Sequence, residues 1–206
     1  TSLSGNNLTL DFQASQSGTA TIIIQGTSNG VTVIDTFTVT VTNVSPTIHS
    51  VSSTVPDGYY GIGEVIPITI NFDEIITITG TPQLTLETGI TDAVVDYTSG
   101  SGSTTLVFNY TVASGHATND LDYASVGALA LNGGTIKDDG GKSAILTLPD
   151  VGTSGSLGDN KNIILGYPDG ASCTTDDQCN SYDCDACGEC GGNNTTFCLA
   201  DGLECI

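Results

Sequence analysis

Two alternating runs decide the fold: residues 64–73 read EVIPITINFD, and residues 103–112 read STTLVFNYTV. Large apolar side chains take every second position in both runs, at Ile66, Ile68, Ile70 and Phe72 and at Leu106, Phe108, Tyr110 and Val112. An apolar period of two is typical of a β-strand that buries one face and exposes the other. The two runs therefore predict strands of an all-β fold around one core.

Shorter alternating sets extend this pattern, at Ala93, Val95 and Tyr97 and at Ala144, Leu146 and Leu148. Glycines fall between the runs, where turns use backbone conformations that cost glycine little. Closely spaced short strands with turn residues between them are typical of a β-sandwich. Because Pro46 cannot continue a central strand, we expect one complete sandwich domain over residues 46–167.

Residues 1–45 predict a smaller β unit. Its strand candidates are LTLDF at 8–12, TATIIIQ at 19–25 and IDTFTVTVT at 34–42. In the last candidate, Phe37, Val39 and Val41 share one face and threonines share the other. Three strands bury too little surface for an independent domain. We expect the unit to be completed upstream in a longer precursor or by strands of another chain, with an arbitrary sequence boundary as the alternative.

The charge balance argues against two classes of partner. The chain of 206 residues carries 23 Asp and Glu against 3 Lys and Arg, a formal net charge of -20. Nucleic acid and anionic membranes both attract basic surfaces, so we expect neither as a partner. No apolar run reaches the roughly 20 residues of a membrane-spanning helix, and we expect no membrane insertion.

The tail, residues 168–206, predicts a small disulfide-rich module. It holds all seven cysteines of the chain, at Cys173, Cys179, Cys184, Cys187, Cys190, Cys198 and Cys205. Such crowding indicates disulfides formed in an oxidising, extracellular setting. Zinc held by the closely spaced cysteines between 184 and 190 is the alternative. Three bridges leave one cysteine over, free or paired to another segment or chain, and Cys205 is the candidate.

Three runs in order carry a resemblance to a known family: residues 57–89 (DGYYGIGEVIPITINFDEIITITGTPQLTLETG), 97–112 (YTSGSGSTTLVFNYTV) and 120–138 (DLDYASVGALALNGGTIKD). Together they resemble the Ig-like repeat of very large bacterial surface proteins, called the SWM repeat. Residues 35–48, DTFTVTVTNVSPTI, are similar to the closing strand of cadherin-like repeats, and CGECGGNNTTFC at 187–198 resembles CGxCGG-type disulfide elements of secreted proteins. The resemblance implies Ig-like sandwiches in series, displayed on a cell surface and serving adhesion rather than catalysis.

Acidic turn residues make calcium the expected cofactor, if the chain has one. The candidate ligands are Asp57, Asp120, Asp122 and Asp138. Carboxylate oxygens in loops suit Ca²⁺, although none of these stretches matches an EF-hand loop, and a solvated acidic surface is the alternative. Compared with the family pattern, His116 stands where Asp is more common, which weakens a loop site there. Asn-x-Ser/Thr patterns mark glycosylation candidates at Asn109, Asn7, Asn43 and Asn194.

The sequence predicts no catalytic site. Gly26–Gly30 matches the G-x-S-x-G pattern, but a strand follows it directly, which indicates a hairpin turn instead of a nucleophile elbow. Only two histidines, His49 and His116, are present, too few for a three-histidine metal site. We therefore expect a structural extracellular protein, part of a surface fibre, adhesin or sheath, that associates with itself or with neighbouring modules of a longer chain. The alternative is a module that binds carbohydrate or a receptor through Tyr59, Tyr60 and Tyr123.

Overall fold

The structure is a computed structural model that describes residues 2–4, 7–11 and 17–166. Its strands are, in chain order, Ser2–Ser4 (β1), Asn7–Thr9 (β2), Gly18–Ser28 (β3), Val31–Val41 (β4), Ile48–Ser53 (β5), Gly58–Tyr60 (β6), Val65–Thr79 (β7), Gln83–Glu87 (β8), Ala93–Ser99 (β9), Ser103–Thr111 (β10), Asp122–Tyr123 (β11), Leu129–Ala130 (β12), Thr135–Asp138 (β13) and Ile163–Leu165 (β14). A short helix, α1, spans Leu157–Asn160. The expected all-β fold is confirmed.

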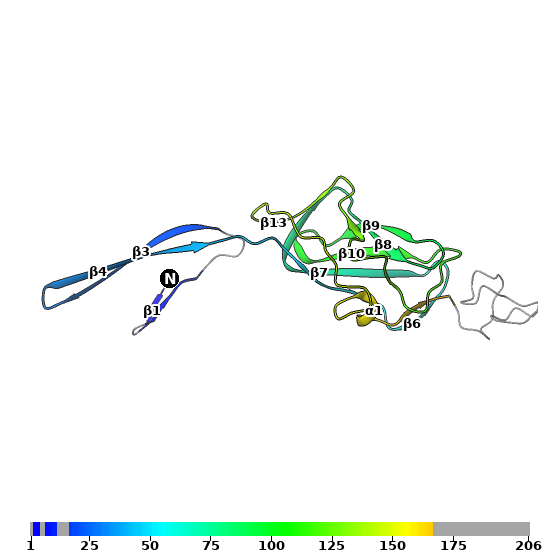
Figure 1. Ribbon diagram of the computed structural model, residues 1–206, viewed down its shortest axis with the longest axis horizontal. Coiled ribbons are helices and arrows are strands. Elements are labelled where there is room, and N and C mark those ends of the chain that lie inside the picture. The colour runs from blue at the N-terminus through cyan, green and yellow to red at the C-terminus, as the bar shows by residue number, and fades with distance from the viewer. Residues whose placement is uncertain (1, 5–6, 12–16, 167–206) are drawn as a thin grey trace, which may run out of the picture.

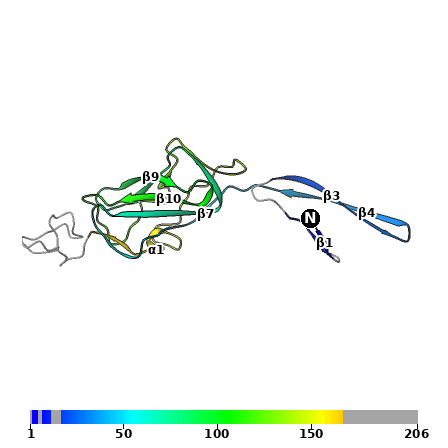
Figure 2. The ribbon, with the colours of Figure 1, turned by 180° about the vertical axis from the view of Figure 1, so that it is seen from behind.

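A long hairpin projects from a folded body (Figure 1). Strands β3 and β4 pair with each other in a two-stranded sheet, and β1 and β2 form a second, much shorter pair. We call residues 48–166, from the start of β5 onwards, the body. The view from behind shows the same arrangement, with the hairpin leaving one end of the body (Figure 2).

An eight-stranded sheet makes up most of the body. Its main path runs β11-β8-β9-β10-β7-β13, with β5 also paired to β7 and β12 to β8. Every pairing in it is antiparallel. Strands β6 and β14 form a separate parallel pair, so the last described strand returns to the beginning of the body.

The core lies where the alternation predicts it. Strands β7 and β10 are antiparallel neighbours in the sheet, with Ile68 opposite Phe108 and Ile70 opposite Leu106. All four side chains are fully buried. They belong to one apolar cluster that also includes side chains of β8, α1 and β14. The ring of Tyr97 packs edge-on against Phe108, with centroids 6.1 Å apart. A single continuous core therefore holds the body together.

Strand β7 contains a bulge that the sequence pattern did not predict. Asn71 pairs with Thr105, whereas Ile76 pairs with Ser103, so β7 has extra residues between the two pairs. A bulge bends a strand and redirects its side chains. Beyond it, the end of β7 pairs with β13. Asp73 lies in the bulge and is exposed, at the place where the hairpin joins the body.

One expected strand is absent from the described residues. The set Ala144, Leu146 and Leu148 does alternate in burial, and Leu148 is 2% exposed. However, the backbone N–H groups of this segment donate to carbonyl oxygens of three separate segments. Ala144 donates to Ile136, Ile145 to Pro46 and Leu148 to Val126. A segment that bonds in turn to several neighbours packs like a strand but does not form a regular ladder.

Candidate functional site

The β3–β4 hairpin is regular over its whole length. Its eleven residue pairs run without interruption from Gly18 opposite Val41 to Ser28 opposite Val31. The turn consists of Asn29 and Gly30, both with positive φ, at 49° and 78°. A two-residue Asn-Gly turn of this kind matches the right-handed twist of the strands that it joins. The G-x-S-x-G run is thus a hairpin turn, as predicted.

The hairpin has two unlike faces. Residues directly opposite each other share a face, and the face alternates along each strand. From the register, one face carries Ala20, Ile22, Ile24, Val31, Val33, Phe37, Val39 and Val41. We call these eight residues the apolar face; Asp35 lies among them. The other face carries mainly threonines, at positions 19, 21, 27, 32, 36, 38 and 40, together with Ile23, Gln25 and Ile34.

The apolar face is uncovered by the described residues. Val31 is 67% exposed, Val33 68% and Ile24 42%. Only Ile22, Val39 and Val41 are half-buried. Contiguous exposed apolar surface on a soluble protein usually marks an interaction site. Within the described part of the chain, no third strand pairs with β3 or β4, so both outer edges also keep unpaired backbone groups.

The residues between hairpin and body are fastened to the body by four groups of hydrogen bonds. Asn43 donates through Nδ2 to Asp138 Oδ2 at 2.8 Å, and Lys142 Nζ donates to the Asn43 carbonyl at 2.6 Å. Ile145 N–H donates to the carbonyl oxygen of Pro46, a buried residue, at 2.8 Å. Thr47 then bonds to the carboxylate of Asp73. We call residues 43–47 the junction; its contacts fix the direction in which the hairpin leaves the body.

Of the predicted calcium ligands, the structure brings together Asp120 and Asp122. A Cβ placed on Gly158 of α1 would lie 3.1 Å from the Oδ2 atom of each. Partial burial raises the pKa of Asp120, and the charge of Asp122 raises it further. Asp122 is 7% exposed and already accepts hydrogen bonds from the N–H groups of Tyr123 and Gly152. Two carboxylates thus repel each other at the start of α1.

The other two predicted ligands have separate structural roles. Asp57 accepts a hydrogen bond from Asn162 N–H at 3.1 Å, between β6 and β14. Asp138 is 4% exposed and accepts from Lys142 N–H as well as from Asn43. Among the described residues, no three or more His, Cys, Asp or Glu side chains gather as a metal site would require. The four aspartates therefore do not form one site.

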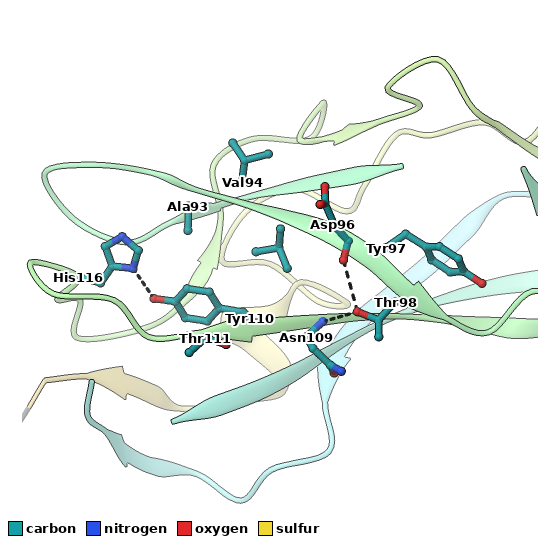
Figure 3. A pocket seen from close by; sticks show the side chains of 10 residues that line it. Ala93, Val94, Asp96, Tyr97, Thr98, Asn109, Tyr110, Thr111 and His116 are labelled. Carbon is teal, nitrogen blue, oxygen red and sulfur yellow. Dashed lines mark hydrogen bonds between the residues drawn. The ribbon is translucent and has the colours of Figure 1, made fainter. Parts of the chain in front are cut away.

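A polar hollow of about 690 Å³ opens between β9 and β10 (Figure 3). The two strands pair only at Val107 with Ser99 and Phe108 with Tyr97, and then diverge. The hydroxyl of Thr98 bridges the split, accepting from Asn109 N–H at 3.1 Å and donating to the Asp96 carbonyl at 3.4 Å. Asp96, Asn109 and His116 are among the side chains that line the hollow.

Tyr110 and His116 close one end of this hollow, as Figure 3 shows. Their rings stack with centroids 5.9 Å apart, and Tyr110 Oη lies 2.8 Å from His116 Nδ1. Ala113 N–H also points at Nδ1, at 3.4 Å, so Nδ1 accepts and the tyrosine hydroxyl donates. Burial lowers the pKa of His116 and raises that of Tyr110. The pair is a neutral hydrogen-bonded unit that positions the loop after β10.

The predicted glycosylation candidates lie in different surroundings. Asn109 is exposed between buried Phe108 and Tyr110, as predicted for a glycan acceptor, whereas a glycan on Asn43 would replace the bond to Asp138. Asn7 lies on β2. Asn194, the module 168–206 and its seven cysteines lie outside the described residues.

The three tyrosines expected at a ligand site differ in exposure. Tyr59 is 47% exposed, and Tyr60 is half-buried with its hydroxyl bonded to the Pro56 carbonyl. The expectation for Tyr123 is wrong, because its ring is fully buried and its hydroxyl donates to the Pro149 carbonyl at 2.6 Å. The isolated sequence Leu-Asp-Tyr gave no sign of this burial.

Sequence reasoning missed two features. It found the face of Phe37, Val39 and Val41 but not the matching face of β3, although the Asn-Gly turn fixes the register that joins them. It also gave no indication of the junction's contacts, because these bonds reach residues far along the chain.

Within the described part of the chain, no helix has the length and apolar character to cross a membrane. The resemblance to SWM and cadherin-like repeats stays a prediction that rests on the quoted motifs. No family model, curated protein or solved structure matches this chain.

Proposed function

We propose that this chain is a structural protein of the extracellular surface, a subunit or fragment of a fibre, adhesin or sheath built from Ig-like β modules. The observation that carries the proposal is the apolar face of the β3–β4 hairpin, which projects from the body and which no described residue covers. Contiguous exposed apolar surface marks an interaction site, and a protein that assembles into a larger structure needs one.

The junction supports a mechanical role. Its hydrogen bonds tie the base of the hairpin to β7, β13 and the loop around Lys142. Because these contacts are side-chain and backbone bonds spread over several elements, a pull on the hairpin is transmitted to the body instead of bending one flexible link. A swivelling linker would need no such fastening.

The charge distribution supports assembly at the hairpin. The chain has a formal net charge of -20, yet residues 17–42 contain a single charged side chain, Asp35. Repulsion between acidic bodies keeps copies apart in solution, while a nearly neutral hairpin allows contact at one place. The cysteine-rich tail, in this proposal, is a disulfide-stapled end suited to an oxidising exterior.

Antibodies raised against residues 46–166 would test this function on intact cells of the source organism. We expect labelling of unpermeabilised cells and recovery of the chain in a high-mass surface fraction. Labelling that requires permeabilisation would refute the proposal. A cytoplasmic protein labelled in parallel provides the control for cell integrity.

A second candidate function, recognition of carbohydrate, is favoured by the hollow between β9 and β10. Residues with carboxylate, amide, hydroxyl and imidazole groups line it, and such polar groups suit sugar hydroxyls. Saturable binding on a glycan array that is lost in Asp96→Ala and kept in Asp92→Ala would support it. Asp92 is an exposed aspartate just before β9 and is not among the residues lining the hollow.

A further inference from the structure

Within the described residues, the apolar face lacks a second layer to cover it. It runs the whole length of the eleven-pair hairpin and is almost free of charge, and its outer half is the most exposed part. The junction holds it off the body. An isolated two-stranded hairpin is marginally stable in water, so a face of this kind calls for a second layer.

We propose that the apolar face packs against the apolar face of a second copy of this chain, giving a two-layer, four-stranded interface. The inference rests on the assembly role proposed above and names its partner. Two sheets pack face to face about 10 Å apart with their apolar side chains interdigitated. The threonine faces then form the two outer surfaces.

A second copy fits because its face has the same length and pattern. Eleven residues at ~3.4 Å each make a hairpin about 37 Å long. Two such faces together bury on the order of 1,000 Å², which is at the lower end of specific interfaces. The contact is isologous and closed, so growth of a fibre would use another surface in addition.

Charge also favours contact between hairpins. The acidic bodies lie beyond the junctions, away from the turn (Figure 1). Packing of two hairpins in opposite directions places these bodies at opposite ends, where their repulsion is screened over a Debye length of about 8 Å. Addition of a strand at the hairpin edge would satisfy backbone groups but would leave the apolar face in water, which makes it the weaker arrangement.

Asp35 is the one feature that opposes this packing. It lies on β4 opposite Ile24, within the apolar face, and its Oδ1 accepts a hydrogen bond from Thr36 N–H at 2.9 Å. Dimerisation brings both copies of this carboxylate to the interface, where desolvation disfavours the charge. Asp35 therefore limits affinity, and its neutralisation strengthens the dimer.

Sedimentation velocity of the full chain over a concentration series tests the inference. We expect a dimer in the wild type, association weakened at least about tenfold by Val33→Asp, and little change in Thr38→Asp. Val33 and Thr38 lie on opposite faces of the same strand, so the pair separates face from strand. Asp35→Asn is expected to tighten association by about three- to tenfold.

Each contrary result would overturn the inference and would point to a different explanation. Equal association of wild type, Val33→Asp and Thr38→Asp would exclude this face while leaving assembly, and the proposed function, in place. A wild-type monomer at about 100 µM, well above the concentration that a specific interface needs, would refute the second copy as occupant. A monomer in which Val33→Asp alone lowers the melting temperature would assign the face to another segment of the same chain. Surface labelling of cells decides the proposed function separately.

Discussion

Thr47 holds both carboxylate oxygens of Asp73. Its N–H donates to Oδ1 at 2.7 Å and its hydroxyl to Oδ2 at 2.6 Å, while Asp73 N–H donates back to the Thr47 carbonyl at 3.1 Å. The slight desolvation of Asp73 alone would raise its pKa, but the hydrogen bonds from Thr47 and from its own backbone N–H, together with the nearby His49, outweigh this effect and lower the pKa. This contact anchors the junction in the bulge of β7.

Thr47→Val removes the hydroxyl and keeps the N–H bond. We expect it to lower the free energy of unfolding by about 1 kcal/mol at pH 7. Because the folded pKa of Asp73 is lowered, its stabilisation is present above the unfolded pKa of about 4 and is lost as the pH falls through the lower folded value. Urea unfolding at pH 7 and at about pH 2 measures both. Thr77→Val on the same strand is the control, and an equal loss at both pH values would contradict the assignment.

Gly134 has no room for a side chain. A Cβ there would overlap the carbonyl oxygen of Thr79, where β7 ends, and would come within 3.1 Å of the Leu131 carbonyl. Since both obstacles are backbone, we expect Gly134→Ala to destabilise the body by about 2 kcal/mol or more. Gly127→Ala, whose Cβ would meet only Ser125 Oγ, at 3.9 Å, apart from its chain neighbours, is the matched control in thermal unfolding. Similar melting temperatures for the two variants would refute this reason for glycine.

The body was predictable because its signal is local. Alternation along each strand identifies the faces of Ile66, Ile68 and Ile70 and of Leu106 and Phe108, and the structure buries all of them. The bulge at Asp73 and the bonds of the junction depend on partners 26 to 99 residues away, on which local periodicity has no bearing. For the hairpin, alternation gave the apolar face of β4 correctly but predicted its burial, because a pattern cannot tell whether a second layer is present.

His116 should make stability depend on pH. Its Nδ1 accepts a hydrogen bond from Tyr110, and burial lowers its pKa. The folded state therefore resists protonation, so stability is full above the unfolded pKa of about 6.5 and falls as the pH drops below it. We expect the urea midpoint to decrease from pH 7.5 to pH 5 in the wild type and in His49→Gln, and to change less in His116→Gln. An unchanged slope in His116→Gln would contradict this role.

The carboxylates of Asp120 and Asp122 allow a test of calcium binding. The effect of Asp120→Asn on stability is expected to have one sign without the ion and the opposite sign with calcium bound. Partial burial and the charge of Asp122 raise the pKa of Asp120, so its contribution to stability is present below the unfolded pKa of about 4 and is lost as the pH rises through the folded value. In chelator at pH 7, we expect Asp120→Asn to be more stable than the wild type by less than about 1 kcal/mol.

Calcium bound between the two carboxylates would reverse that order. Added Ca²⁺ would then raise the melting temperature of the wild type and leave Asp120→Asn unchanged, since a ligand stabilises only the state that binds it. Asp92→Asn, at an exposed aspartate outside the pair, should follow the wild type in both buffers. If calcium shifts the wild type and Asp120→Asn equally, the pair is not its site. The native mass in the same two buffers then shows whether the ion bridges copies through other carboxylates.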